Sequence, residues 1–210
     1  KDLNAGAGHV VKNLIKVGSG TQVLSGANTY SGVTQVNAGT LRIGAGGTTG
    51  ALGSSSTEVR LQGGTLVFDL SAAYSVSQKI VGDGSVGALV QAGSGTTTLT
   101  SNLNTYRPAT LVSAGKLVFA GSQTATASVD IASGATLELA ASLATFSHPS
   151  GITYTGAGTL ARNAASGSSV SYLYGPNGGT IRMSKDGLIR VLAGELRLDN
   201  GASSRWKAAD

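Results

Sequence analysis

The stretch SGANTYSGVTQVNAGTLRI, residues 25–43, places glycines at positions 26, 32 and 39 among Thr, Val, Leu and Ile residues that favour β-strands. A weaker copy, TSNLNTYRPATLVSAGKLVFA, occupies residues 100–120. It repeats the order Asn, Thr, Tyr and then the order Ala, Gly, x, Leu. The interruption of short strands by glycine is therefore periodic, and this period decides the fold.

Composition excludes most helical folds. Gly supplies 32 of the 210 residues, and 12% of the residues are charged. Gly costs about 1 kcal/mol relative to Ala inside a helix, so few segments of this chain can form one. The apolar fraction of 40% and the alternation of apolar with polar residues indicate a folded chain and not a disordered linker.

Small residues followed by Leu or Ile recur along the chain with a mean spacing near twenty residues, which is typical of a solenoid, whereas propeller blades need about 40 to 45. The spacing predicts an all-β parallel β-helix of about nine or ten rungs, one of them near Ile80 or Leu89. Glycines would form its corners, where a positive φ is needed. We expect the rung leucines to stack in the bore, each at an equivalent corner; these are Leu41, Leu66, Leu117, Leu137, Leu160 and Leu196.

The whole chain, residues 1–210, is predicted to be a single β-helix fragment. Its strongest repeat is residues 14–43 and its weaker copy is residues 93–119. Residues 150–200 carry more aromatic and long aliphatic side chains, and we expect this C-terminal block to be the more stable part. The chain has no Cys, which excludes disulfides and thiolate metal sites.

Residues 14–43 resemble the autotransporter-associated β-strand repeat of autotransporter passenger domains, which are secreted through the bacterial outer membrane. The weaker copy departs from the pattern, with Ser101 in place of Gly26, Pro108 in place of Gly32 and one inserted residue. The positions that match the pattern are Lys16, Gly18, Gly20, Thr21, Leu24, Gly26, Asn28, Tyr30, Gly32, Thr34, Val36, Ala38, Gly39 and Leu41.

This resemblance implies a right-handed single-stranded parallel β-helix that is secreted or held on the cell surface, after export through the outer membrane of a Gram-negative bacterium. It implies a non-enzymatic scaffold or stalk, whose partner in cis is an outer-membrane translocator barrel outside this fragment. We expect a monomer without a cofactor. Because the basic residues are scattered singly, the net charge of +5 does not indicate a nucleic-acid partner.

Two other functions stay open. An adhesin segment that binds a surface glycan or protein predicts a contiguous exposed apolar or aromatic patch. A polysaccharide lyase or tailspike-type hydrolase predicts carboxylates that converge in a groove. No strand carries acids at positions i and i+2, and Glu138 and Glu195 lie beside a rung Leu, where an acid is usually solvated. We therefore expect no catalytic and no metal-binding residues.

Aromatic residues supply the one candidate ligand site. Tyr172 and Tyr174 share a face through their spacing, and with Asn177 they form the candidate glycan-binding residues. Tyr30 and Tyr106 occupy the same repeat position, so we expect both to pack against a turn. The sequence GDGSVG, residues 82–87, matches a dinucleotide fingerprint, but no helix-forming segment follows it, and we interpret it as a corner.

Overall fold

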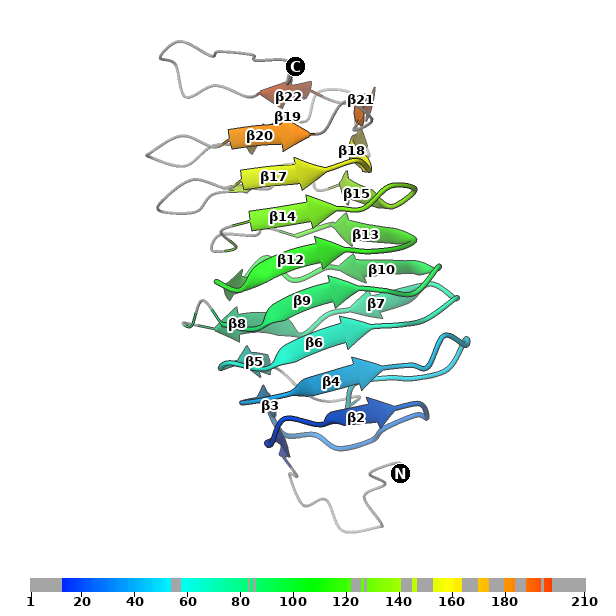
Figure 1. Cartoon of the computed structure of the whole chain (residues 1–210), viewed down its shortest axis with the longest axis vertical. Helices are drawn as coiled ribbons and strands as arrows, with labels where there is room; N and C mark the ends of the chain where they lie inside the picture. Colours follow the sequence, from blue (N-terminus) through cyan, green and yellow to red (C-terminus); the bar gives the residue numbers. More distant parts are fainter. Residues whose placement is uncertain are drawn as a thin grey trace.

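The protein is a stack of short parallel β-strands (Figure 1). A computed structural model describes residues 13–53, 58–82, 84, 86–121, 126, 128–140, 145–146, 153–163, 170–173, 180–183, 188–193 and 195–197. Every strand pair in it is parallel, as the sequence predicted, and successive turns of the chain supply neighbouring strands.

The strands form four sheets, named A to D here. Sheet A contains β1 (Leu14–Lys16), β3 (Thr34–Val36), β5 (Glu58–Leu61), β8 (Lys79–Gly82) and β11 (Thr105–Tyr106). Sheet B contains β2 (Thr21–Leu24), β4 (Thr40–Ile43), β6 (Thr65–Phe68), β9 (Ala88–Gln91), β12 (Ala109–Val112), β14 (Ser128–Ile131), β17 (Thr153–Gly156) and β20 (Thr180–Met183). Sheet C contains β7 (Tyr74–Val76), β10 (Thr96–Leu99), β13 (Lys116–Phe119), β15 (Thr136–Leu139), β18 (Thr159–Asn163) and β21 (Leu188–Ala193). Sheet D contains β16 (Thr145–Phe146), β19 (Val170–Leu173) and β22 (Glu195–Arg197).

The number of turns is smaller than the nine or ten expected. Six turns each contribute one strand to sheet B and one strand to sheet C. The two turns before them contribute a strand to sheet B but none to sheet C. Turn length also varies, since Thr21 pairs with Thr40 and Thr40 pairs with Thr65, which are offsets of 19 and 25 residues. The handedness of the coil stays a prediction.

The rung leucines fill the bore, but they do not share one corner. Leu41 pairs in register with Leu66 in sheet B, and Leu66 pairs with Leu89. Leu117 pairs with Leu137 in sheet C, and Leu137 pairs with Leu160. The five predicted leucines among these are fully buried. Leu196 lies in sheet D, and its side chain is outside the described residues. The expectation of one equivalent corner was therefore wrong.

The positions of the two repeat copies explain this difference, because corresponding strands of the second copy lie in the next sheet around the stack. In the first copy, β1, β2, β3 and β4 alternate between sheets A and B. In the second copy, β9 and β12 belong to sheet B, β10 and β13 belong to sheet C, and the short β11 between them belongs to sheet A. Leu41 and Leu117 hold the same place in the repeat and thus fall in different sheets. The excess count of rungs arose from adding leucines of both sheets.

The local structure of the two copies is nevertheless the same. Tyr30 and Tyr106 are both buried, as expected for packing against a turn. Each phenol oxygen shares a hydrogen bond with the Thr hydroxyl four residues later, at 2.7 Å to Thr34 and 2.9 Å to Thr110. Burial raises the pKa of both phenols, because desolvation disfavours the phenolate.

A side-chain donor closes the first corner of each copy. The Lys16 ammonium lies at the inner side of its corner and donates to the carbonyl oxygens of Val17, Gly18 and Ala38 at 2.8, 2.7 and 3.0 Å. In the second copy, the Gln91 amide nitrogen donates to the carbonyl oxygens of Gly93 and Gly95. These side chains satisfy turn carbonyl oxygens, of which that of Gly95 also accepts from the Lys116 backbone N–H.

The backbone conformation explains the glycine in the Ala-Gly-x-Leu part of the repeat. Gly39 has a φ of 63° and Gly115 a φ of 56°, a region that side chains other than Gly rarely adopt. A Cβ atom at Gly39 would also overlap the carbonyl oxygens of Gly18 and Gly20 in the preceding turn. The stacking of one corner on the next therefore requires glycine here.

We predict that Gly39→Ala destabilises the protein by roughly 2 to 4 kcal/mol, because positive φ and overlap with the preceding turn both oppose it. Gly18→Ala should cost about 1 kcal/mol, because its φ of 71° is strained but a Cβ would meet no atom within 4 Å. Gly20→Ala should be nearly neutral, since neither penalty applies. Urea denaturation of the three variants measures the order, and a Gly39 variant as stable as the Gly20 variant would contradict it.

Candidate interaction surface

The outer face of sheet B is an uninterrupted ladder that faces the viewer in Figure 1. Inward and outward side chains alternate along each strand, and the register aligns the outward ones into two columns. The small-residue column consists of Thr21, Thr40, Thr65, Ala88, Ala109, Ser128 and Thr153. The second column, called the sheet B stripe here, consists of Val23, Arg42, Val67, Val90, Leu111, Asp130 and Thr155.

The middle of the stripe is apolar. Val67 pairs with Val90, and Val90 pairs with Leu111, so three aliphatic side chains stand on adjacent strands. Val67 and Val90 are half-buried by their neighbours, and Leu111 is exposed. This is the kind of contiguous apolar patch that the adhesin alternative requires.

Charged side chains bound the apolar segment on both sides. Arg42 precedes Val67 in the column, and its Nε and Nη2 atoms both donate to the Asp69 carboxylate. Asp130 follows Leu111 and is exposed, with its Oδ1 atom accepting a hydrogen bond of 2.6 Å from the Thr155 hydroxyl. The central part of the stripe therefore runs from a cation through three aliphatic side chains to an anion.

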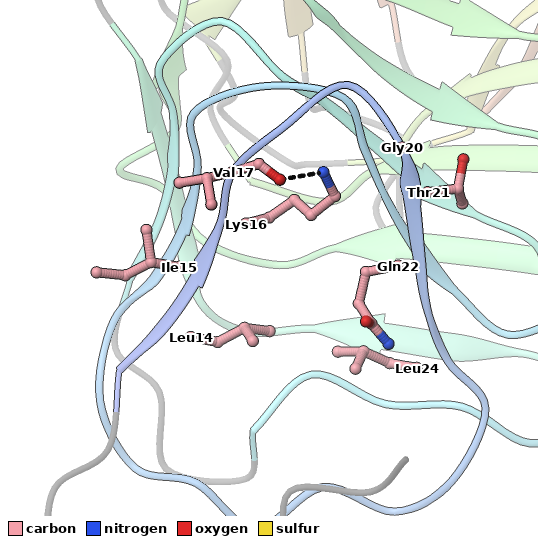
Figure 2. Close-up of a pocket in the computed structure, with 8 residues that line it drawn as sticks. All are labelled: Leu14, Ile15, Lys16, Val17, Gly20, Thr21, Gln22 and Leu24. Atoms are coloured by element: carbon pink, nitrogen blue, oxygen red, sulfur yellow. Dashed lines mark hydrogen bonds between the residues drawn. The ribbon is translucent and has the colours of Figure 1, made fainter.

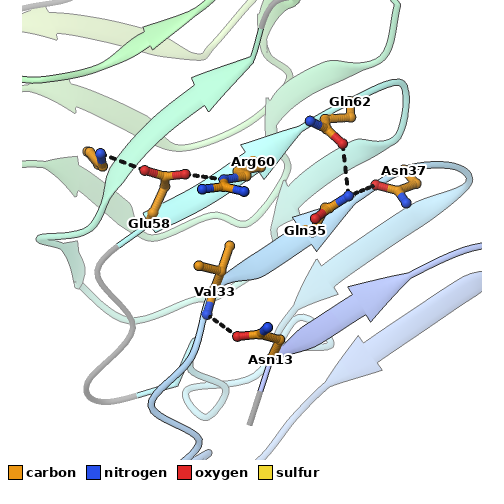
Figure 3. A network of polar contacts seen from close by, with 8 residues as sticks. Asn13, Val33, Gln35, Asn37, Glu58, Arg60 and Gln62 are labelled. Carbon is orange, nitrogen blue, oxygen red and sulfur yellow. Dashed lines mark hydrogen bonds and ion pairs between the residues drawn. The ribbon is translucent and has the colours of Figure 1, made fainter. Parts of the chain in front are cut away.

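The outer face of sheet A is polar by contrast (Figure 3). The Gln35 amide nitrogen donates to Asn37 Oδ1 at 2.7 Å and to Gln62 Oε1 at 2.8 Å, which links two successive turns. Glu58 forms ion pairs with both Arg60 and Lys79. Hydrogen bonds from Lys79, then from Arg60, lower the pKa of the Glu58 carboxyl group.

The bore opens at the β1 and β2 end of the described stack (Figure 2). The hollow has a volume of about 510 Å³ and is lined by Leu14, Ile15, Lys16, Val17, Gly20, Thr21, Gln22 and Leu24. Leu14, Gln22 and Leu24 continue the inward columns of the turns above, since they pair with Thr34, Leu41 and Ile43. The hollow is thus the end of the described core, and its described lining contains no carboxylate or imidazole.

Three of the described carboxylates, those of Glu58, Asp69 and Glu138, are paired with basic side chains. Glu138 is 8% exposed, accepts from Lys116 Nζ at 2.9 Å and is not the solvated edge charge that we expected. Asp69 and Glu58 are equally well covered and paired with bases. Within the described ranges, no group of three or more His, Cys, Asp or Glu side chains is placed to hold a metal ion.

Arg162 is a buried charge that sequence reasoning missed. It aligns with Leu139 on the inner side of sheet C, is fully buried, and donates from Nη1 to the Leu139 carbonyl oxygen at 2.8 Å. Desolvation lowers its pKa. In the sequence TLARN the residue occupies an inward position that a period of two would have identified, although a charged side chain is rarely placed there.

Tyr30, Tyr106 and Tyr154 are buried, so these three side chains do not contribute to an outer glycan-binding surface. The backbone of Tyr172 lies in β19, paired with Thr145, but its side chain is not described. The other two candidate glycan-binding residues, Tyr174 and Asn177, lie outside the described residues.

The described residues of GDGSVG lie between two strands, as expected for a corner. Gly82 ends β8 and Gly87, with a φ of 91°, precedes β9. A strand and not a helix follows, so the N-terminal anion site of a dinucleotide fold is missing from this segment.

No helix in the described part of the chain has the length and apolar character required to span a membrane.

We predict that Glu58→Gln makes the free energy of unfolding depend less on pH in the acidic range. A carboxyl group with a lowered pKa in the folded state stabilises the protein above its unfolded pKa, near 4.5, and this contribution is lost as the pH falls through the folded pKa. The effect should be about 1 kcal/mol or less, because Arg60 and Lys79 are both half-exposed. Denaturant titrations from pH 7 to pH 3 measure it. Lys79→Met should also reduce the dependence of the unfolding free energy on pH, but by less. If neither variant changes this dependence, Glu58 is not the group responsible for it.

Comparisons with known proteins agree with this architecture. The family model described as "Passenger-associated-transport-repeat" matches residues 14–43 and 89–119. The protein "Adhesin BmaC autotransporter" of Brucella suis biovar 1 (strain 1330) is 40% identical over 81 residues, which is 39% of this chain and 2% of that protein. No solved structure matches the chain. The chain therefore carries two passenger-associated transport repeats on a parallel β-solenoid and is a distant homologue of an autotransporter adhesin.

Proposed function

We propose that this chain is a non-enzymatic scaffold or stalk segment of an autotransporter passenger on the bacterial surface. The observation that carries the proposal is the continuous parallel ladder of sheet B over an apolar bore, built partly from passenger repeats. A solenoid of this kind is extended and stiff, since each turn is hydrogen-bonded to the next. Export through the outer membrane of a Gram-negative bacterium, with a translocator barrel in cis, follows from the passenger context and belongs to this proposal.

Rung-by-rung folding suits such an export route. Each completed turn presents a row of unpaired backbone groups at its edge, and the next turn to emerge can pair with them. We propose that residues 150–200 are the more stable block from which this pairing starts. The support is their larger share of aromatic and long aliphatic residues.

An adhesin role is the second candidate, because the chain is homologous to part of an adhesin and exposes the apolar sheet B stripe. The proposed glycan-binding residues Tyr172, Tyr174 and Asn177 belong to this alternative. Catalysis on polysaccharides has less support, since Glu58, Asp69 and Glu138 are each paired with a basic side chain.

Surface display tests the scaffold directly. The chain is placed between a folded reporter and a translocator barrel, and external protease is added to intact cells. Leu137→Asp should lower display strongly, because an unpaired charge in the bore costs several kcal/mol. Thr136→Asp is the matched control, since Thr136 is a half-exposed residue of the same strand. Equal display of both variants would show that the folded stack does not carry the reporter.

Hydrogen exchange tests the position of the stable block. Amides between Ile152 and Leu198 should exchange more slowly than amides between Leu14 and Leu66, because better-filled turns open less often. The reverse order would remove the argument for a C-terminal folding nucleus.

Assays on polysaccharides test the proposed lack of catalysis. The purified protein should show no calcium-dependent lyase and no hydrolase turnover on acidic and neutral polysaccharides, and a chelator should leave the melting temperature unchanged. Turnover that disappears in the Asp69→Asn or Asp130→Asn variant would favour the enzyme instead.

A further inference from the structure

We propose that the outer face of sheet B binds a second copy of this chain in antiparallel orientation. The observation behind the proposal is the order of side chains along the sheet B stripe. That order is Arg42, Val67, Val90, Leu111 and Asp130 on five successive strands. It places opposite charges at equal distances from a central aliphatic residue, so the stripe is complementary to its own reverse.

The symmetry centres on β9. Three strands of sheet B, namely β2, β4 and β6, precede β9, and four strands, β12, β14, β17 and β20, follow it, so β20 is the one strand without a counterpart on the other side of β9. A two-fold axis that lies in the interface along β9 keeps the strand direction and reverses the strand order. Such an axis sets Arg42 opposite Asp130 of the second copy, Val67 opposite its Leu111, and Val90 opposite itself.

The small-residue column fits the same axis. Thr40 comes opposite Ser128 of the second copy, Thr65 opposite its Ala109, and Ala88 opposite itself. None of these side chains is large, so the two sheets can approach to the spacing of about 10 Å that is usual for packed sheets. The aliphatic residues of the stripe then meet across the interface.

The charges select the antiparallel arrangement. A guanidinium group has five N–H donors, so Arg42 can hold Asp69 through Nε and Nη2 and still donate to the second copy's Asp130. Asp130 is exposed and already orders its carboxylate against Thr155, so little rearrangement is needed. A parallel arrangement at the same level would bring Arg42 against Arg42 and Asp130 against Asp130, and like charges disfavour it.

The other outer faces lack this pattern. On sheet A the central outward column reads Ile15, Gln35, Arg60, Val81 and Thr105, which has no acid to match its base. On sheet C the register places Glu138 and Arg190 on either side of Ala161, but Ala161 and Val118 are both buried, so the described part of this column has no exposed aliphatic side chain. Among these described faces, an exposed aliphatic segment between opposite charges is therefore specific to sheet B.

The area of the face sets the strength of the contact. The seven strands from β2 to β17, at about 4.8 Å spacing and about four residues each, cover about 400 Å² on each copy. This is about half of the 800 Å² per partner in a standard stable interface. A single contact is thus weak and transient, and it would become effective where many copies face one another. The monomer expected from the sequence is the dominant form of the dilute chain.

Sedimentation equilibrium of the whole chain, from micromolar to millimolar concentration, tests the proposal. The unmodified chain should show a reversible monomer–dimer equilibrium. Asp130→Arg puts two arginines at each end of the stripe, and Val90→Lys puts two lysines at the axis, so both should weaken the dimer more than about tenfold. Thr105→Lys, on the exposed outer side of sheet A, is the matched control and should leave the dimer unchanged.

Charge complementation tests the orientation. Arg42→Asp alone should also be monomeric, whereas a mixture of the Arg42→Asp and Asp130→Arg chains should form heterodimers, because both charge pairs are restored. Melting temperatures are measured first, since Arg42→Asp also removes the partner of Asp69. If that variant does not fold, Asp130→Arg and Val90→Lys decide the question. A chain that stays monomeric throughout, a dimer unaffected by those two variants, or folded partners that fail to associate would each overturn the proposal.

Discussion

The parallel register between successive turns is the constraint on which the rest of the structure depends. Backbone hydrogen bonds join each turn to the next even at the corners, as between Asn37 N and Lys16 O at 2.9 Å and between Thr65 N and Gly39 O at 2.8 Å. A slip of one residue would turn Leu41 outward and expose an aliphatic side chain in every turn it affected. Differences in turn length must therefore be absorbed between the strands, where glycines, Lys16 and Gln91 hold the corners.

Local sequence was a good guide wherever the determining contact is short in range. The buried positions of Leu41 and Leu137, the turn packing of Tyr30 and the corner role of Gly39 all follow from alternation and from glycine. The sheet to which each strand belongs was not predictable in this way. The sequence of a repeat unit is the same whichever pair of adjacent sheets its strands join. Leucines from sheets B and C therefore looked equivalent, and the turns were overcounted.

Electrostatics escaped prediction for a related reason. Lys116 covers Glu138, and Arg42 covers Asp69, from strands that lie a full turn away in the sequence. The aliphatic run of Val67, Val90 and Leu111 is likewise invisible until the register places the three side chains on adjacent strands. The length of each turn decides which side chains become neighbours on the outer face of a solenoid, and the turn length is irregular here.

The rotation of the second repeat by one face has a consequence for recognition. A receptor or antibody that recognises a side-chain pattern of the repeat would meet its two copies pointing in different directions around the stack. It could not engage both with two arms approaching from the same side, so binding to one segment would stay monovalent. Duplication of the unit here therefore lengthens the solenoid without placing two identical epitopes on one face.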